Sequence, residues 1–277
     1  AGYAPHVRFF YINNSLFLFL FSQDKKRTEQ LIITRVPFDV GRNIKTVYSD
    51  TDYMLLGMLI ERLTNMPLDQ YVEQEIYHPL NLKRTLFNPL RKGFTPSQFA
   101  ATEIQGNTRG GAVTFDNVRT HVLQGEVHDG KAFYSFDGIA GHAGLFSDVD
   151  ELAILTQTLL NGGGYGDTKV FEQSVLTQFV KPEENNNSFG LGWRRADRTQ
   201  NKWHFGPYAS QYAYGHTGWT GTATVIDPLY DLAIILLTNK RHSEVQADGE
   251  TFASSEFETG KYGSVVSLVY EALLENE

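Results

Sequence analysis

Two short stretches of the sequence combine residue types that could hold a substrate and act on it. The first is YGHTGWTGTATVID (Tyr214 to Asp227), in which His216, Thr217 and Gly218 open a run that then becomes β-branched and apolar. Glycine weakens a strand, so its presence indicates that something lies close against the backbone. His216 adds a group whose ordinary pKa of about 6.5 makes it a cation only on the acid side.

The second stretch is VYSDTDY, in which Tyr48 immediately precedes a predicted helix start. Ser49 and Asp52 have the spacing of a capping box, and Asp50 lies two residues after the tyrosine. A phenol has an ordinary pKa of about 10, so proton transfer by Tyr48 near neutral pH requires a neighbouring cation that lowers this pKa. Taken alone, such a tyrosine is more often a packing residue, His216 a satisfied histidine, and a strand glycine the mark of a bulge.

Composition and motifs exclude several other chemistries. The sequence has no cysteine, which removes disulfides, thiolate metal sites and a cysteine nucleophile. It contains neither H-E-x-x-H nor a metal-ligand spacing among its eight histidines, so we expect no metal and no cofactor. It also lacks the G-x-S-x-G nucleophile elbow. The net charge of −8 and the absence of a long basic cluster argue against nucleic acid as a partner.

Hydrophobic periodicity predicts the elements that must position these residues. Helices are expected at 49–65, 147–164 and 262–275, with shorter ones at 68–77 and 171–180. The first of these helices has an expected apolar face of Met54, Leu55, Met58, Leu59 and Leu63. Three glycines after Asn161 suit a left-handed end to the helix at 147–164.

Strands are expected late in the chain, at 189–195, 214–218, 222–226 and 231–239, and their short connections predict an antiparallel meander. Because the strands are segregated from the helices, the fold class is α+β. Near the start, VRFFYI and SLFLFLF flank Asn13-Asn14, which predicts a hairpin, and the apolar run is far shorter than the roughly 20 residues of a membrane span. No signal peptide is visible.

The tyrosine motif and the His216-Thr217-Gly218 strand together resemble the penicillin-recognising serine hydrolases, which include class C β-lactamases, low-molecular-mass penicillin-binding proteins and related esterases. When the segments GEVHDGKAFY, LLNGGGYGD and FGLGWR are considered together with these motifs, the sequence is similar to the penicillin-binding protein 4B group of D-alanyl-D-alanine carboxypeptidases. This resemblance runs from about Ser22 to the C-terminus. The resemblance implies a β-lactamase/transpeptidase-like fold, with an antiparallel sheet flanked by helices plus a mostly helical and irregular region.

The resemblance also implies roles for individual residues. In the family, a Tyr-x-Asn element supplies a catalytic tyrosine, and a Lys/His-Thr-Gly strand forms one wall of the site along which the substrate backbone lies. Asp50 stands where the family has asparagine, which adds negative charge and leaves the substrate class open. The residues carried over are Tyr48 and His216 as catalytic residues, and Asp50, Thr217, Gly218 and Trp219 as substrate-binding residues, with the Trp219 N–H as an oxyanion donor.

The acylating serine of the family lies in an S-x-x-K motif well upstream of the tyrosine. The obvious match here is Ser22-Gln23-Asp24-Lys25, only 26 residues before Tyr48. The flanking KKRTEQ is charged, so we expect no buried helix entry and interpret Ser22 and Lys25 as a decoy. The sequence therefore predicts a chain that is N-terminally incomplete, starts after the true motif and is inactive or nearly so.

The leading hypothesis is one partial β-lactamase-like domain over 1–277, with a helical and irregular region at about 49–185 and a sheet with its closing helix at about 186–277. Its expected substrate is a D-Ala-D-Ala peptide or a β-lactam, and its expected location is the periplasm or envelope of a bacterium. The alternatives are a non-catalytic protein that binds peptidoglycan peptides or β-lactams, and an esterase for small esters. An uncovered sheet edge would favour self-association.

Overall fold

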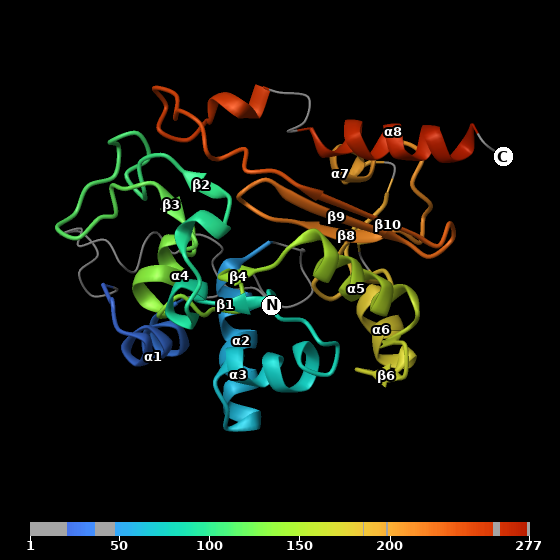
Figure 1. The fold of residues 1–277 in the computed structure, drawn as a ribbon, viewed down its shortest axis with the longest axis horizontal. Helices are drawn as coiled ribbons and strands as arrows, with labels where there is room; N and C mark the ends of the chain where they lie inside the picture. Colours follow the sequence, from blue (N-terminus) through green and yellow to red (C-terminus); the bar gives the residue numbers. More distant parts are fainter. Residues whose placement is uncertain (1–20, 37–47, 185, 198, 257–260, 276–277) are drawn as a thin grey trace. The chain divides into compact units, whose positions relative to one another are not determined.

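The computed structural model describes residues 21–36, 48–184, 186–197, 199–256 and 261–275. The chain divides into two compact units, Ala1–Ser147 and Asp148–Glu277 (Figure 1). The predicted N-terminal hairpin lies outside the described residues except for its last position, and the organisation as one partial domain stays a prediction. Along the described segments, no helix has both the length and the apolar character needed to cross a membrane.

In its described part, the first unit combines helices and irregular segments with two small antiparallel sheets. The sheets pair β1 with β4 and β2 with β3. Its helices are α1 (Lys25–Arg35), α2 (Asp50–Thr64), α3 (Leu68–Val72), the π-helical η2 (Glu73–Tyr77), the 3-10 turns η3 (Pro89–Lys92) and η4 (Pro96–Gln98), and α4 (Gly130–Ser135). Its strands are β1 (Leu86–Phe87), β2 (Ala101–Glu103), β3 (Leu123–Gln124) and β4 (Leu145–Phe146).

Helix α2 begins and ends as the sequence predicts, but it buries a different face. The Ser49 hydroxyl accepts a hydrogen bond from the Asp52 backbone N–H at 3.3 Å, and Asn65 ends the helix with a φ of 52°. The expected apolar face is only partly correct, because Leu59 and Leu63 are 49% and 76% exposed. The buried positions are Thr51, Met54 and Gly57.

The reason for this rotated face is a close packing of backbone on backbone. A Cβ atom on Gly141 would lie 2.1 Å from the Tyr53 carbonyl oxygen, and one on Gly57 would lie 3.1 Å from the Gly141 nitrogen. The segment that follows α4 therefore lies directly on α2, and small residues decide which side of the helix is covered.

Helices α1 and α4 do not emerge from the sequence pattern, yet both contribute to the core of the first unit. Asp24 caps α1 by accepting a hydrogen bond from the Arg27 N–H at 2.8 Å, and the buried Thr28 and Ile32 share one face of it. The expectation that KKRTEQ is no helix entry is therefore wrong, since a single buried stripe suffices among charged neighbours. The core cluster consists of Ile32, Val36, Met54, Val127, Ala132, Phe136 and Ala140.

The second unit carries the larger sheet, whose strand order is β10-β9-β8-β7 with every pair antiparallel. This is the predicted meander. Its helices are α5 (Val149–Leu160), α6 (Gln173–Val180), α7 (Lys202–Phe205), the 3-10 turn η5 (Ala253–Glu256) and α8 (Tyr262–Leu274). Its strands are β5 (Gly164–Tyr165), β6 (Thr168–Lys169), β7 (Arg194–Arg195), β8 (Tyr214–Thr217), β9 (Thr222–Asp227) and β10 (Leu232–Leu237).

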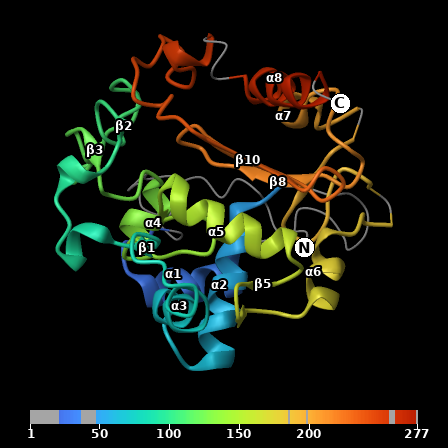
Figure 2. The ribbon, with the colours of Figure 1, turned by 45° about the vertical axis from the view of Figure 1, so that its right-hand side comes forward.

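Helices cover both faces of this sheet (Figures 1 and 2). Helix α5 contacts β9 and β10 on one face, while α7 and α8 pack together on the other. The core on the α8 side consists of Phe205, Ala213, Val225, Ile234, Val266 and Tyr270. Val225 and Ile234 are register partners on neighbouring strands, so the alternation of side chains places both on this face.

Two details differ from the sequence predictions. Asp148, rather than Ser147, caps α5 by accepting a hydrogen bond from the Glu151 N–H at 3.0 Å, while the Ser147 hydroxyl lies 2.8 Å from that of Thr85. The strand expected at 189–195 is reduced to β7, because the chain turns back where Gly192 adopts a φ of 85°. The glycine stop after α5 is confirmed, with positive φ at Gly162 and Gly163.

A buried carboxylate joins the end of β9 to α8. Asp227 has no exposed surface, and it accepts hydrogen bonds from the Ser210 N–H at 2.8 Å, the Ser210 hydroxyl at 2.6 Å and the Leu229 N–H at 3.1 Å. The Tyr270 hydroxyl donates a further one at 2.7 Å. Burial, together with this contact, raises the pKa of Tyr270, so its phenol remains a donor.

We expect Tyr270→Phe to lower the free energy of unfolding by about 1–2 kcal/mol, because a buried carboxylate loses one donor while the apolar packing is kept. Urea denaturation followed by circular dichroism measures the change. Tyr212→Phe is the matched control, since the Tyr212 side chain is 54% exposed and the same change there should alter stability by less than about 0.5 kcal/mol. Equal effects of the two substitutions would contradict this assignment.

Candidate active site

The glycines of the His-Thr-Gly strand are explained first by the neighbouring strand. A Cβ atom on Gly215 would lie 2.0 Å from the Thr224 carbonyl oxygen, and one on Gly218 would lie 2.3 Å from the Thr222 hydroxyl. His216 pairs with Thr224, while the ladder from β7 reaches only Tyr214 and Gly215. What lies close against this backbone is therefore β9, and a substrate is not needed to account for the glycines.

His216 is a neutral base at physiological pH. Its Nδ1 lies 2.9 Å from the Thr217 carbonyl oxygen, and because a carbonyl can only accept, Nδ1 carries the hydrogen. Burial lowers the pKa of His216, and the positive charge of Arg194 lowers it further, against a smaller raising effect of the bond to Thr217. The side chain is therefore uncharged above its ordinary pKa of about 6.5.

Arg241, which the sequence motifs do not identify, holds the backbone just after β8. Arg241 donates from Nε to the Trp219 carbonyl oxygen at 3.1 Å, and its guanidinium carbon lies 3.9 Å from the Trp219 ring centroid. The guanidinium carbon of Arg241 also lies 4.5 Å from the ring centroid of the buried Phe252. Stacking and the hydrogen bond together fix the turn that would present the Trp219 N–H.

The tyrosine motif lies at the start of α2. Tyr48 is 49% exposed, and its ring centroid lies 6.5 Å from that of Tyr53. Asp50 is the first residue of α2, and its Oδ2 lies 2.7 Å from Nζ of Lys131 in α4. Lys131 belongs to the GKAFY segment that carries part of the family resemblance, but no local pattern connects it to Asp50.

Two further polar residues adjoin this ion pair. His142 Nε2 lies 3.0 Å from Asp129 Oδ1, and the same carboxylate caps α4 through the Ala132 N–H. Burial alone would raise the pKa of Asp129, but the hydrogen bond and charge of His142, the charge of Lys131 and the Ala132 N–H hold it well below its usual range. The Asp129 carboxylate is therefore ionised at neutral pH.

Ligand atoms of Asp50, Asp129 and His142 lie within 4.8 Å of one another. Among the described residues, this group comes nearest to a set that could hold a metal ion. The Lys131 ammonium, however, already contacts Asp50, and a second cation there would be repelled. The arrangement therefore suits a network of charge-assisted hydrogen bonds better than a metal site.

The S-x-x-K match places its serine inside the protein. Ser22 is only 2% exposed. Its Oγ donates a hydrogen bond to the Asp24 carbonyl oxygen at 2.9 Å and lies 2.8 Å from the Thr28 hydroxyl. Lys25 Nζ lies 2.7 Å from Glu61 Oε1, an oxygen that also accepts the Leu68 N–H at 3.0 Å. Both side chains are thus engaged with other partners.

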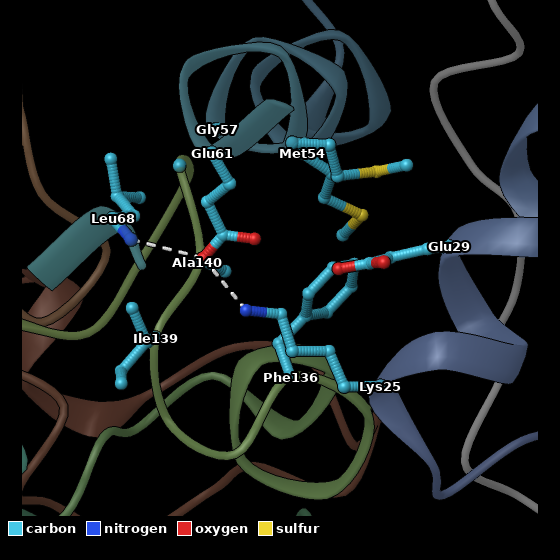
Figure 3. Close-up of a pocket in the computed structure, with 11 residues that line it drawn as sticks. Lys25, Glu29, Met54, Gly57, Glu61, Leu68, Phe136, Ile139 and Ala140 are labelled. Carbon is cyan, nitrogen blue, oxygen red and sulfur yellow. Dashed lines mark hydrogen bonds and ion pairs between the residues drawn. The ribbon is translucent and has the colours of Figure 1, made fainter. Parts of the chain in front are cut away.

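Figure 3 shows Lys25 and Glu61 on the wall of a small pocket between α1, α2 and the segment after α4. Met54, Phe136 and Ile139 supply apolar lining to it. Ser22 is not among its lining residues. A hydroxyl that is buried and already bonded is poorly placed to attack a substrate, and the interpretation of this pair as a decoy stays a prediction.

The predicted site residues thus fall into two groups. Tyr48 and Asp50 lie at the start of α2 in the first unit, whereas the residues from His216 to Trp219 lie in or just after β8 in the second. Their catalytic and substrate-binding roles stay predictions.

A model of the β-lactamase family matches residues 32–255, which is most of the chain. The chain belongs to the β-lactamase family. The predicted resemblance to serine hydrolases of the β-lactamase and penicillin-binding type is therefore confirmed.

Two relatives are identical to this β-lactamase-family chain at about half of the aligned positions. A Bacillus subtilis (strain 168) protein named N-acetylmuramyl-L-alanine amidase is 53% identical over 256 residues, which is 91% of this chain and 58% of the relative. An Escherichia coli (strain K12) protein named for an ascribed D-alanyl-D-alanine carboxypeptidase activity is 49% identical over 266 residues, covering 95% and 61%. The chain thus spans about three fifths of the length of these relatives.

Solved structures agree on the fold. The octameric penicillin-binding protein homologue from Pyrococcus abyssi superposes with a TM-score of 0.58 at 16% identity, covering 92% of this chain and 48% of that one. The predicted α+β, β-lactamase/transpeptidase-like fold is therefore confirmed for this β-lactamase-family chain.

A buried histidine beneath the sheet supports the strand that pairs with β8. His204 in α7 has no exposed surface, and its Nε2 donates to the Thr224 carbonyl oxygen at 3.1 Å. Burial lowers the pKa of His204 to about 4, and the nearby charge of Arg194 acts in the same direction. Among the described residues, His204 Nδ1 has no hydrogen-bond partner, so the ring is held as a neutral donor.

This lowered pKa predicts loss of stability in acid. In the unfolded chain His204 binds a proton at a pH of about 6.5, whereas in the folded chain it does so only at about 4. Its contribution to the free energy of unfolding is therefore complete above pH 6.5 and is lost as the pH falls toward 4. The expected loss is about 3 kcal/mol, from about 1.4 kcal/mol for each pH unit between these values. Urea denaturation from pH 7.5 to 4 measures it, and His204→Gln, which keeps a donor but cannot titrate, should flatten the profile. Identical slopes for the two proteins would contradict the assignment.

Proposed function

We propose that this chain carries the substrate-binding part of a peptidoglycan-acting hydrolase, a D-alanyl-D-alanine carboxypeptidase or β-lactam-hydrolysing enzyme that works by serine acyl transfer. The observation that carries the proposal is the 49% identity to the Escherichia coli relative over 95% of this chain. A substrate of that kind places the protein in the periplasm or cell envelope of a bacterium. The self-association predicted from an uncovered sheet edge stays a prediction.

The proposed chemistry gives each motif a step. A substrate peptide lies antiparallel to β8 and gains main-chain hydrogen bonds, as an added strand does. The Thr217 hydroxyl binds the substrate carboxylate, and the Trp219 N–H stabilises the oxyanion that forms when a serine oxygen attacks the carbonyl carbon. Tyr48 passes the proton of that serine to the leaving nitrogen as the C–N bond breaks. Water then releases the acyl group.

The attacking serine is not assigned to Ser22. Its hydroxyl is buried and bonded to Asp24, and Lys25 is paired with Glu61. The expectation that the 277-residue chain is inactive by itself rests on this point and stays a prediction.

A second candidate is hydrolysis of an N-acetylmuramyl-L-alanine amide, favoured by the 53% identity to the Bacillus subtilis relative. Such an amide has no free carboxylate next to the scissile bond. A neutral His216 does not demand an anion at that position, so the lowered pKa is compatible with this substrate. A binding protein without chemistry and an esterase for small esters remain as further alternatives.

Intact mass after incubation with a fluorescent penicillin tests the proposal, with the full-length Escherichia coli relative as positive control. We expect the control to be labelled and Ser22 of this chain to stay unmodified. Release of D-alanine from diacetyl-L-Lys-D-Ala-D-Ala, and binding of this peptide by the chain, then separate the candidates. A chain that neither binds the peptide nor reacts with penicillin, beside an active control, would sink the carboxypeptidase assignment.

The affinity for an anionic peptide should depend on His216. We expect diacetyl-L-Lys-D-Ala-D-Ala to bind roughly fivefold more tightly at pH 5.5 than at pH 8, because a protonated imidazole attracts the carboxylate and this attraction is lost as the pH rises through the lowered pKa. Calorimetric titration measures the affinity. The same peptide with an amidated C-terminus is the control and should show no such dependence, nor should His216→Asn with the free acid. A pH dependence that survives in His216→Asn would assign the effect to another group.

A further inference from the structure

Asp50 creates an electrostatic problem for the proposed function. Its carboxylate lies two residues from Tyr48, and the proposed substrate is itself an anion. An uncompensated carboxylate there would repel the substrate. Helix α2 relieves this only in part, because a negative charge at a helix N-terminus is favourable but remains a negative charge.

The structure places a cation directly on Asp50. The Lys131 ammonium is 2.7 Å from Asp50 Oδ2, across 81 residues of sequence. The Lys131 side chain is only 16% exposed and that of Asp50 28%, so solvent screens the pair less than it would a surface ion pair. Lys131 lies in the first turn of α4, where the helix dipole disfavours a positive charge. Local helix formation therefore does not explain its presence.

The residues around Lys131 fix it in place. Asp129, two residues earlier, caps α4 through the Ala132 N–H at 2.8 Å and is bonded to His142 at 3.0 Å. His142 is nearly buried, with a side chain 3% exposed. These two hydrogen bonds hold the turn that presents Lys131, whose ammonium contacts the Asp50 carboxylate at the start of α2.

We propose that Lys131 is a positioning residue that neutralises Asp50, so that the tyrosine motif accepts an anionic substrate. The inference rests on the proposed function. An aspartate with an ammonium on one oxygen presents an acceptor and donors without net charge, as an asparagine side chain does. Removing the lysine restores the negative charge, whereas removing both charges together does not.

A double-mutant cycle on the whole 277-residue chain tests neutralisation without any substrate. Urea denaturation at pH 8 compares the wild type with Lys131→Met, Asp50→Asn and the double variant. We expect Lys131→Met to raise the equilibrium constant for unfolding roughly fivefold, because Asp50 is left beside Asp129 without its cation, and the double variant to recover most of this loss. If Lys131→Met and the double variant are equally destabilised, Lys131 does not neutralise Asp50 and the inference is wrong.

Peptide binding supplies the readout that a merely structural role would not move. At pH 8, where His216 is neutral, Lys131→Met should weaken binding of diacetyl-L-Lys-D-Ala-D-Ala roughly tenfold, and adding Asp50→Asn should restore it to within about threefold. The peptide with an amidated C-terminus should lose little in Lys131→Met, and Lys131→Arg should retain affinity for the free acid. An equal loss for both peptides would show that Lys131 only supports the fold.

A matched control and the wild type itself separate the two proposals. Lys169 forms an exposed ion pair with Glu172, with both side chains more than 60% exposed, so Lys169→Met should change neither stability nor binding. If the wild type binds neither the free acid nor the amidated peptide, the proposed function is wrong, and so is the inferred effect of Lys131 on substrate binding. The unfolding cycle still decides whether Lys131 neutralises Asp50.

Discussion

The close approach of β8 to β9 is the constraint on which the proposed substrate-binding wall depends. Gly215 fits only because it has no side chain, since the Thr224 carbonyl oxygen occupies the space where a Cβ would lie. The same carbonyl accepts the hydrogen bond of the buried His204. One peptide group of β9 therefore fixes both the register of His216 and the distance between the two strands. A wall built in this way is rigid, which a strand must be if it is to orient a substrate backbone.

Local signals predicted the elements whose formation depends mainly on local interactions. Ser49 and Asn65 delimit α2 because cap geometry is set within a few residues, and the part of the meander from β8 to β10 follows from its short connections. Helix α1 was missed because its buried Thr28 and Ile32 are diluted by charged neighbours. The face that α2 buries could not be predicted, since the packing of Gly57 on Gly141 is decided 84 residues further along the chain.

The candidate site was predictable to the same limited extent. The motif residues could be named because their types and spacing are local, but their partners could not. Lys131 reaches Asp50 across 81 residues, and Arg241 reaches Trp219 across 22. Lys131 lies just after the cap of a short helix that the sequence pattern does not predict, so its unfavourable position against the helix dipole becomes visible only in the structure.

Cations beside the two motifs balance the charges that the motif residues bring, which favours an anionic substrate over a cationic one. His216 is neutral at physiological pH and supplies no positive charge, and Asp50 brings a negative one. Each has a cation within its own unit, with Lys131 on Asp50 and Arg241 on the backbone that follows His216. Had the site been adapted to a cationic substrate, a lysine paired with Asp50 would have cancelled the attraction that the aspartate provides.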